Sequence, residues 1–456
     1  MKDIQNIYFI GIGGIGMSNL ARYFMAKGKQ VAGYDRTETL LTKELTKEGA
    51  SVHYEDDTAL IPGAFKNPGN TLVVYTPAVP ADSNEMAYFR ANGFDMHKRA
   101  EVLGLITQAS KALCCAGTHG KTTTSSMLAH ILKQSHLDVN AFLGGILKNY
   151  NNNLLLSDTS EFTVVEADEY DRSFHWLHPY MALITSVDPD HLDIYGTEEA
   201  YLKSFEHFTS LIQPGGALVL KINTKLNPKV CQNVRVYTYS QDKGDFHATN
   251  IRIGNGEIRF DFVTPKEVIK DIHLGVPIKI NIENAVGSMA LAWLNGVTAD
   301  ELRQAMATFQ GAKRRFDFLL KTDKVVMIDD YAHHPDELAA SITSVKALYP
   351  DRKVTGIFQP HLYSRTKDFA PEFAKSLSLL DELILLDIYP AREKPIEGVT
   401  SQIIFDKVTC PKTLCRKDEL LAILENKQDI EVLLTIGAGD IDQLLQPIKE
   451  LLEKRR

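Results

Sequence analysis

Residues 117–124 combine glycines, a lysine and consecutive threonines, and this combination is suited to binding phosphate. In a P-loop, backbone amides surround the phosphates, a lysine reaches their outer oxygens, and a threonine hydroxyl binds Mg²⁺. Lys121 is the candidate phosphate lysine and Thr122 the candidate metal ligand. The candidate phosphate-binding residues are Gly117, Thr118, His119, Gly120, Lys121, Thr122 and Thr123. The spacing differs from GxxxxGK[ST], because Cys115 occupies the first glycine position; a chance Gly-Lys-Thr in a loop is the alternative.

A second glycine cluster lies at the end of the first predicted strand. It consists of Gly11, Gly13, Gly14 and Gly16, and Asp35 follows at the end of the next predicted strand. Glycines permit a tight turn and a close approach of backbone N–H groups to a diphosphate, and an acid about twenty residues later is suited to a ribose. The cluster predicts a site for a diphosphate nucleotide such as NAD or a UDP-sugar. The alternative is a tight turn that binds no ligand.

Acidic residues and a histidine follow two further predicted strands. Glu166, Asp168 and Asp171 follow one strand, and His191 follows the next. Side chains at the carboxyl ends of parallel strands point into the crevice where ligands bind. Mg²⁺ prefers oxygen ligands, so one imidazole among them is unusual. We expect Glu166 and His191 to bind metal, whereas Asp168 and Asp171 equally fit a role as helix caps.

The elements that must position these residues alternate along the whole chain. Short β-branched runs alternate with amphipathic helical stretches, which predicts parallel sheets covered by helices. The predicted strands are Ile7–Ile10, Gln30–Tyr34, Thr71–Tyr75, Ala112–Ala116, Thr163–Glu166, Met181–Thr185, Ala217–Leu220, Val325–Ile328, Val354–Phe358, Leu383–Asp387 and Val432–Ile436. They fall into three blocks, with expected domains at 1–108, 109–313 and 314–456.

One polar stretch inside the second block breaks this pattern. Residues 246–277 contain Asn255-Gly256, a dipeptide that favours a tight hairpin turn. We therefore expect an antiparallel β insert there.

Several segments together resemble the Mur ligases of peptidoglycan synthesis. The segments GIGGIGM, GTHGKTTT, EADEYD and DHLDIYG occur in the family's order. Later segments that resemble the family are Asn281–Ala285, Phe309–Phe316, Asp329–Pro335, Gln359–Thr366 and Gly437–Asp440. The resemblance covers nearly the whole chain. A nicotinamide dehydrogenase, which the first glycine cluster alone would allow, leaves GTHGKTTT unexplained.

The resemblance implies an α/β fold of three domains and an ATP-dependent ligation. A Rossmann-like N-terminal domain would bind a UDP-sugar, a central P-loop ATPase-type α/β domain would bind ATP and Mg²⁺, and a Rossmann-like C-terminal domain would bind the amino acid. Within the family, the best match joins L-alanine to the carboxylate of UDP-N-acetylmuramate. The route would be an acyl phosphate, with release of ADP and phosphate. The alternative within the family is a recycling ligase that adds a preformed tripeptide.

The resemblance also assigns roles residue by residue. Glu166 and His191 would hold the second metal. Further ATP contacts would be Asn281, Asn284, Arg314 and Asp330. The residues facing the amino acid and the reacting carboxylate would be Tyr331, His333 and Arg365, and the catalytic set would be Lys121, Glu166, His191, His333 and Arg365. From the residues alone, His333-His334 can instead cap a helix before Pro335.

The chain departs from the family at one position near this set. Leu362 stands where relatives carry an arginine, so one cationic contact near the amino acid or the muramate carboxylate is lost. A carboxylate is bound best by a guanidinium, through two parallel charge-assisted hydrogen bonds, and leucine can form neither. Arg365 is therefore the best remaining candidate for holding that anion.

Composition limits the classes of partner. The formal net charge is −8, which disfavours proteins that coat nucleic acid or anionic membranes. No run approaches the roughly 18 apolar residues of a membrane span. The N-terminal residues lack a signal-peptide layout, and the 5 cysteines form no CxxC pair. We expect a cytoplasmic protein that binds neither nucleic acid nor membrane.

Overall fold

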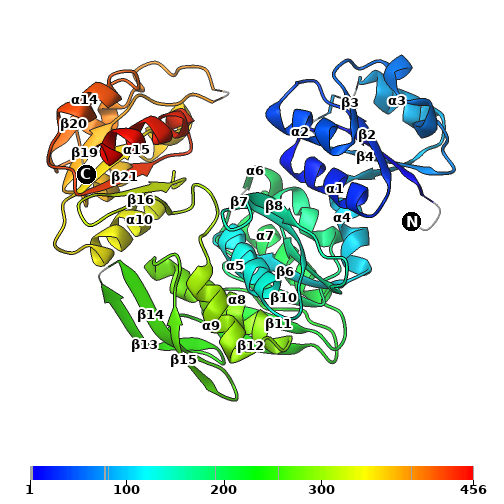
Figure 1. Ribbon diagram of the computed structural model, residues 1–456, viewed down its shortest axis with the longest axis horizontal. Helices are drawn as coiled ribbons and strands as arrows, with labels where there is room; N and C mark the ends of the chain where they lie inside the picture. Colours follow the sequence, from blue (N-terminus) through cyan, green and yellow to red (C-terminus); the bar gives the residue numbers. More distant parts are fainter. Residues whose placement is uncertain are drawn as a thin grey trace. The chain divides into compact units, whose positions relative to one another are not determined.

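The computed structural model describes residues 4–76, 79–80, 82–190, 192–254, 256–391 and 393–454 (Figure 1). The chain divides into two compact units. The first holds Met1–Ile146, Asn151–His247 and Val286–Ala305, and the second holds Leu147–Tyr150, Ala248–Ala285 and Met306–Arg456.

The first sheet of the first unit is parallel throughout, in the order β3-β2-β1-β4-β5. Its strands are β1 (Asn6–Ile10), β2 (Gln30–Tyr34), β3 (Ser51–His53), β4 (Thr71–Tyr75) and β5 (Asp95–Lys98). Its α-helices are α1 (Ile15–Ala26), α2 (Leu40–Glu48), α3 (Asn84–Ala91) and α4 (Arg99–Gln108). All residues of β1 are buried, as expected for the central strand of a sheet covered by helices. This order matches five of the six strands of the Rossmann order 3-2-1-4-5-6.

The second sheet of the first unit carries the P-loop candidate. Its order is β12-β11-β10-β6-β9-β7-β8. The strands are β6 (Lys111–Ala116), β7 (Asn140–Leu147), β8 (Asn152–Leu155), β9 (Phe162–Glu166), β10 (Met181–Ile184), β11 (Ala217–Lys221) and β12 (Arg235–Tyr239). The helices that follow its strands include α5 (Lys121–Gln134), the 3₁₀ helix η3 (Tyr170–Trp176), α6 (Leu192–Tyr195) and α7 (Glu198–Ser210). The carboxyl ends of β6, β9 and β10 therefore deliver three candidate segments to one edge.

A small three-stranded sheet interrupts the second block, as predicted. It is formed by β13 (His247–Gly254), β14 (Glu257–Val263) and β15 (Val268–His273), and β14 pairs antiparallel with β15. Asn255 of the predicted turn lies outside the described residues. Helices α8 (Lys279–Leu294) and α9 (Ala299–Thr308) follow.

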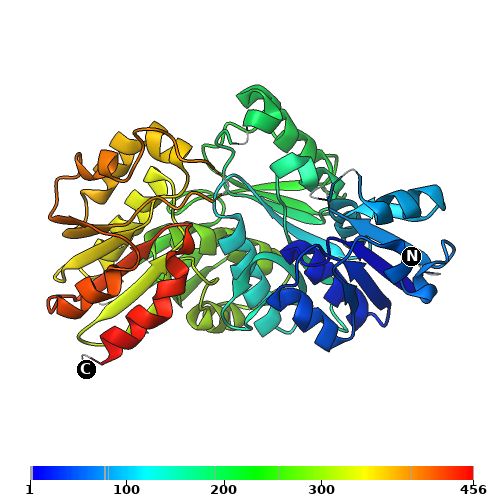
Figure 2. The ribbon, with the colours of Figure 1, turned by 90° about the horizontal axis from the view of Figure 1, so that it is seen from above.

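The third α/β sheet has the order β16-β17-β21-β18-β19-β20. Its strands are β16 (Asp317–Lys321), β17 (Val326–Asp330), β18 (Val354–Phe358), β19 (Glu382–Leu385), β20 (Lys412–Leu414) and β21 (Val432–Ile436). Its α-helices are α10 (Pro335–Leu348), α11 (Tyr363–Asp368), α12 (Ala370–Leu377), α13 (Gln402–Phe405), α14 (Leu420–Asn426) and α15 (Leu445–Glu453). Helices α14 and α15 pack on one face of this sheet, and α10 and α12 cover the other (Figures 1 and 2).

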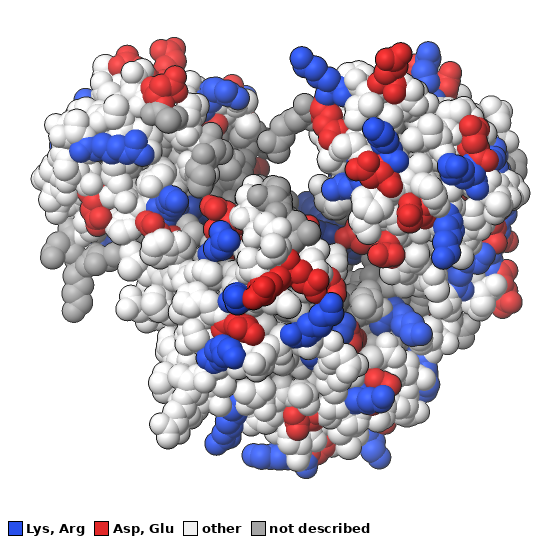
Figure 3. All heavy atoms as spheres, turned by 180° about the vertical axis from the view of Figure 1, so that it is seen from behind, with Lys and Arg blue, Asp and Glu red and all other residues white. Residues whose placement is uncertain are grey.

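The predicted fold class, a three-domain α/β chain, is confirmed. Several strands of the α/β sheets were not predicted: β3, β5, β7, β8, β12, β16 and β20. Of these, β16 runs antiparallel to β17 at the sheet edge. The exact domain bounds stay a prediction. None of the described helices is long and apolar enough to cross a membrane. Among the described residues on the face in Figure 3, basic and acidic side chains are interspersed.

Candidate active site

The P-loop candidate connects β6 to α5 through two glycines in unusual conformations. Gly117 has φ +133°, and a Cβ there would overlap the hydroxyl of Thr185. Gly120, at the N-cap of α5, has φ +83° in the left-handed region. Glycine adopts such angles without the steric cost of a side chain. The loop therefore folds closely onto the end of β10.

Side-chain and backbone hydrogen bonds fix the rest of this loop. The Thr118 hydroxyl donates to the carbonyl oxygen of Asp188 at 2.7 Å, and the His119 backbone N–H donates to Ser186 Oγ at 2.9 Å. Both acceptors belong to the segment that leads to His191. His191 itself lies outside the described residues, so its predicted metal role stays a prediction.

Lys121 forms an ion pair with a carboxylate that the sequence did not single out. Its Nζ donates to Glu169 Oε1 at 2.8 Å and to the carbonyl oxygen of Gly117 at 2.7 Å. The Glu169 side chain is 1% exposed, and its Oε2 has no hydrogen-bond partner among the described residues. Burial raises the pKa of Glu169, and the Lys121 charge opposes that rise. The lysine charge is thus held at the loop by a deeply buried acid.

Glu166 is held between α5 and β7. The Thr122 hydroxyl donates to Glu166 Oε1 at 3.0 Å, and the Gly144 backbone N–H donates to Oε2 at 2.9 Å. A Cβ at Gly144 would overlap this carboxylate. Burial raises the pKa of Glu166, while the Thr122 hydroxyl, Lys121 and the Gly144 N–H lower it. Two of the predicted metal ligands, Thr122 and Glu166, therefore lie in direct contact.

These two side chains fit a magnesium ion by their chemistry. Both are oxygen donors, and Mg²⁺ usually keeps several waters beside one or two protein ligands. Within the described residues, which exclude His191, no group of three or more His, Cys, Asp or Glu side chains is arranged to hold a metal. A site with few protein ligands and several waters matches this arrangement.

The first glycine cluster forms the turn between β1 and α1. Gly11 has φ +87°, and the Gly13 N–H donates to Asp35 Oδ2 at 2.7 Å. Asp35 thus supports the turn directly, in addition to lining the cavity beside it. Gly14 is the N-cap of α1 and gives no side-chain cap, and the first turn of α1 has no acidic residue. The positive N-terminal end of α1 can therefore bind an external anion.

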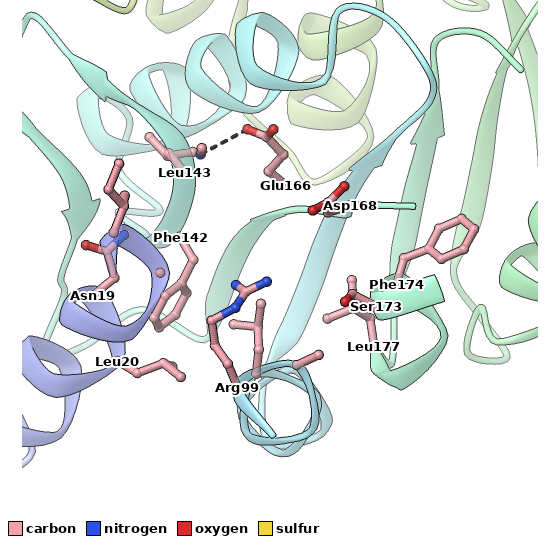
Figure 4. A pocket seen from close by; sticks show the side chains of 15 residues that line it. Asn19, Leu20, Arg99, Phe142, Leu143, Glu166, Asp168, Ser173, Phe174 and Leu177 are labelled. Atoms are coloured by element: carbon pink, nitrogen blue, oxygen red, sulfur yellow. Dashed lines mark hydrogen bonds between the residues drawn. The ribbon is translucent and has the colours of Figure 1, made fainter. Parts of the chain in front are cut away.

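Two cavities lie around this turn. One, of about 660 Å³, is lined by residues that include Gly11, Gly14 and Asp35. The other, of about 330 Å³, reaches Glu166 and Asp168 and is also lined by Phe142 (Figure 4). The predicted diphosphate site and the predicted metal site each border one of these cavities.

In the second unit, Arg314 ties the start of the C-terminal block to its sheet. Its Nη2 donates to the carbonyl oxygen of Gly437 at 2.7 Å, and its guanidinium lies 5.1 Å from the ring centroid of Tyr331. Its Nε lies 3.4 Å from Oδ2 of the buried Asp329. Burial raises the pKa of the neighbouring Asp330. Arg314 and Tyr331 are thus in contact, and Asp330 precedes Tyr331 as the last residue of β17.

His333 lies close to a second histidine that the prediction did not assign. Its Nδ1 lies 3.0 Å from the carbonyl oxygen of Tyr331, and its ring centroid lies 6.3 Å from that of His361. Burial lowers the pKa of His333, and the charge of Arg365 lowers it further. The same two causes lower the pKa of His361. His333, His361 and Arg365 therefore form one electrostatic group.

Further predicted residues lie at the starts of two helices, α10 and α8. His334 occupies the N-cap of α10, and its backbone N–H donates to Glu337 at 3.2 Å, so the capping role left open applies to this histidine. Asn281 and Asn284, the predicted ATP contacts at the start of α8, bond to each other, with Asn284 Nδ2 3.1 Å from Asn281 Oδ1.

Leu362, the departure from the family pattern, has φ +71° at the N-cap of α11. A branched residue in this region carries backbone strain of about 1–3 kcal/mol. Its backbone is held by a hydrogen bond from its N–H to the carbonyl oxygen of Tyr389 at 3.0 Å.

Sequence reasoning missed Glu169, Gly144 and Arg99 as site residues. Glu169 lies inside the EADEYD segment, so its position offered a signal. Gly144 and Arg99 belong to segments without a phosphate or metal motif, and only the fold brings them to the cavities.

Comparison with known families covers nearly the whole chain. Residues 6–111 match the model described as Mur ligase family, catalytic domain; residues 115–292 match the Mur ligase middle domain; residues 314–441 match the Mur ligase, glutamate ligase domain.

Two relatives and one solved structure also match nearly the whole chain. The chain is 66% identical to a UDP-N-acetylmuramate–L-alanine ligase of Parabacteroides distasonis, over 100% of this chain and 99% of that one. It is 61% identical to the enzyme of that name from Phocaeicola vulgatus, over 100% of both chains. The crystal structure of a UDP-N-acetylmuramate–alanine ligase from Thermotoga maritima has a TM-score of 0.79 at 27% identity, covering 99% of this chain and 100% of that chain.

Proposed function

The chain belongs to the Mur ligase family, and from its site we propose that it joins L-alanine to the carboxylate of UDP-N-acetylmuramate at the expense of ATP. The reaction would take place in the cytoplasm and serve peptidoglycan precursor synthesis. The observation that carries the proposal is the convergence of Lys121, Thr122 and Glu166 at the carboxyl edge of the central sheet. The high identity to L-alanine ligases favours this reaction over ligation of a preformed tripeptide.

The first chemical step is phosphoryl transfer. A muramate carboxylate oxygen attacks the γ-phosphorus of ATP, the bond to the leaving ADP oxygen breaks, and an acyl phosphate results. Such a step needs charge neutralisation and positioning more than a protein nucleophile. Lys121 would exchange Glu169 for phosphate oxygens, and the amides of 117–120 would surround them. Asn281, Asn284, Arg314 and Asp330 are further proposed nucleotide contacts.

The metal would be held by Thr122 and Glu166, with His191 as a third proposed ligand. When bound, Mg²⁺ neutralises charge on the phosphate oxygens and can supply several kcal/mol of stabilisation. The contact of Gly144 with the second oxygen of Glu166 leaves Oε1 turned toward Thr122. The chain thus orients one carboxylate oxygen toward the P-loop.

The second step is attack of the L-alanine amine on the acyl carbon, which expels phosphate with the former carboxylate oxygen. The amine must lose a proton. Because the carbonyl oxygen of Tyr331 can only accept, Nδ1 of His333 carries a hydrogen and Nε2 has a free lone pair. Burial and Arg365 lower the pKa of His333, which favours the neutral ring that can accept that proton. Arg365 would hold the carboxylate of the amino acid or of the muramate.

The test is release of ADP and phosphate with UDP-N-acetylmuramate and ATP, supplied with L-alanine, glycine, L-serine or the tripeptide. We expect release that depends on L-alanine and is negligible with the tripeptide. Release with the tripeptide but not with L-alanine would assign the chain to the recycling reaction instead. Omitting UDP-N-acetylmuramate controls for uncoupled ATP hydrolysis.

A further inference from the structure

The two cavities of the first unit share one cationic wall. Both are lined by Gly16 and by Arg99, the first residue of α4. On one side of this wall lies the glycine turn with Asp35, and on the other lie Glu166 and Asp168. A ligand that extends from the turn to the metal-binding carboxylate must therefore pass the guanidinium of Arg99.

The absence of a side chain at Gly16 lets Arg99 reach this position. A Cβ at Gly16 would lie 2.9 Å from both Cδ and Nη1 of Arg99. The arginine side chain thus packs directly against the first turn of α1. This is the turn whose N-cap, Gly14, provides no side chain to its amides.

Arg99 is charged, half-buried and unpaired. Within the described residues, its guanidinium makes no hydrogen bond and no ion pair. Figure 4 shows the guanidinium directed into the smaller cavity, with the carboxylates of Glu166 and Asp168 on the opposite wall. An arginine stays protonated, and partly removing it from water without a partner has a cost that a bound anion would remove. Among the helices of the first sheet, α1 to α4, the other half-buried arginine is Arg22. Its Nε lies 2.7 Å from Glu48 Oε2, so this arginine is paired.

We propose that Arg99 binds the diphosphate of the nucleotide sugar through two parallel hydrogen bonds, at the junction of the two cavities. This inference rests on the proposed function and adds a residue that the glycine motif does not contain. A guanidinium fork matches two phosphate oxygens, and the N-terminal amides of α1 contribute the remaining donors. The sugar then extends into the smaller cavity toward Glu166, while the nucleoside stays in the larger cavity.

Calorimetric titration of UMP, UDP and UDP-N-acetylmuramate into the wild type and Arg99→Met tests this assignment. Methionine keeps the apolar stem and removes the charged fork. Losing a charged hydrogen-bond donor typically weakens binding about 10- to 100-fold. We expect that loss for UDP and for UDP-N-acetylmuramate alike, and less than about threefold for UMP. Arg99→Lys, which keeps the charge without the fork, should fall between.

Arg90→Met is the matched control, because Arg90 is an exposed arginine of α3 that lines neither cavity and its removal changes the net charge equally. It should bind all three nucleotides like the wild type. If Arg99→Met melts at a lower temperature, Arg99→Lys carries the test alone. Unchanged UDP affinity in the folded Arg99 variants would overturn the proposal, and a loss confined to UDP-N-acetylmuramate would assign Arg99 to the muramate carboxylate instead.

These titrations do not depend on catalytic turnover. The binding role of Arg99 and the proposed reaction can therefore be refuted independently. A wild type that binds UDP through Arg99 but releases no phosphate with L-alanine would refute the proposed reaction only. An active wild type whose UDP affinity is indifferent to Arg99 would refute this inference only.

Discussion

Lys121 should be indispensable for turnover and dispensable for binding the UDP-sugar. The glycine turn of the first sheet and the P-loop candidate of the second are separate structures, and Lys121 lines neither cavity at the turn. Loss of one donor aimed at transition-state charge typically lowers kcat 100- to 1,000-fold. We therefore expect Lys121→Met to lower kcat by about 100-fold or more, with the affinity for UDP-N-acetylmuramate within about twofold of wild type.

The same substitution leaves the buried Glu169 without its cation. An unpaired buried charge destabilises the folded state. The double variant Lys121→Met/Glu169→Gln, measured by urea unfolding, should recover part of the stability that the single variant loses, while remaining inactive. A single variant that loses UDP-sugar affinity along with activity, yet unfolds like the wild type, would contradict the two-site account.

Asp329 should make the stability of the protein depend on pH. Burial raises its pKa from 3.8 to about 6, although Thr435 and Arg314 oppose the rise. The folded state therefore holds this proton more tightly than the unfolded state. Its contribution to stability is complete below the unfolded pKa and is lost as the pH rises through about 6.

Urea unfolding of the wild type and Asp329→Asn between pH 4.5 and 7 measures this contribution. At about 1.4 kcal/mol per pH unit, the wild type should lose about 2 kcal/mol relative to the variant over this range. All other titrating groups are shared, so they cancel in the difference. Parallel stability profiles would show that Asp329 ionises alike in both states.

Residues within motifs were more predictable than the residues that contact them. Lys121, Thr122 and Glu166 belong to segments whose residue types indicate phosphate or metal binding. Glu169 could be identified only from its contact with Lys121 in the structure. The sequence alone does not show which acid of an acidic segment contacts the lysine. Arg99 belongs to no motif. It is a candidate binding residue because it lines both cavities.

The close approach of strands β7 and β9 orients the Glu166 carboxylate. Strands β7 and β9 are parallel neighbours, and Gly144 on β7 donates its N–H to Glu166 at the end of β9. A Cβ at Gly144 would displace the carboxylate, which is the flexible end of a side chain, so the fold should survive. Residues that orient a metal ligand typically change metal affinity 10- to 100-fold.

We therefore expect Gly144→Ala to raise the Mg²⁺ concentration for half-maximal activity by about 10- to 100-fold. Gly63→Ala is the control, because a Cβ at Gly63 would meet nothing within 4 Å. It should show the metal dependence of the wild type. An unchanged Mg²⁺ requirement in Gly144→Ala would show that Glu166 does not bind the metal.

Most central strands of the α/β sheets were predicted, whereas their edge strands and the internal strand β7 were not. Val354–Phe358 and Val432–Ile436 were predicted with the bounds observed, and both are buried throughout, so their sequences are continuously apolar or small. Edge strands β3 and β20 are short and partly exposed, so burial imposes no pattern on them. The antiparallel edge strand β16 depends on pairing with β17, which local sequence does not encode.

The reaction proposed for the whole chain activates a carboxylate by phosphorylation. Its three α/β sheets carry separate candidate sites for the UDP-sugar, ATP and the amino acid. Nothing in this chemistry requires a protein nucleophile. Because a carboxylate oxygen attacks the phosphorus in this route, the oxygen that leaves with phosphate comes from the substrate carboxylate and not from water.

The most direct test follows that oxygen. UDP-N-acetylmuramate labelled with ¹⁸O in both carboxylate oxygens is incubated with ATP, Mg²⁺ and L-alanine, and the released phosphate is examined by mass spectrometry. We expect one ¹⁸O in each phosphate released and one ¹⁸O in each amide formed. Unlabelled phosphate accompanying L-alanine-dependent amide formation would contradict an acyl phosphate and with it the proposed mechanism.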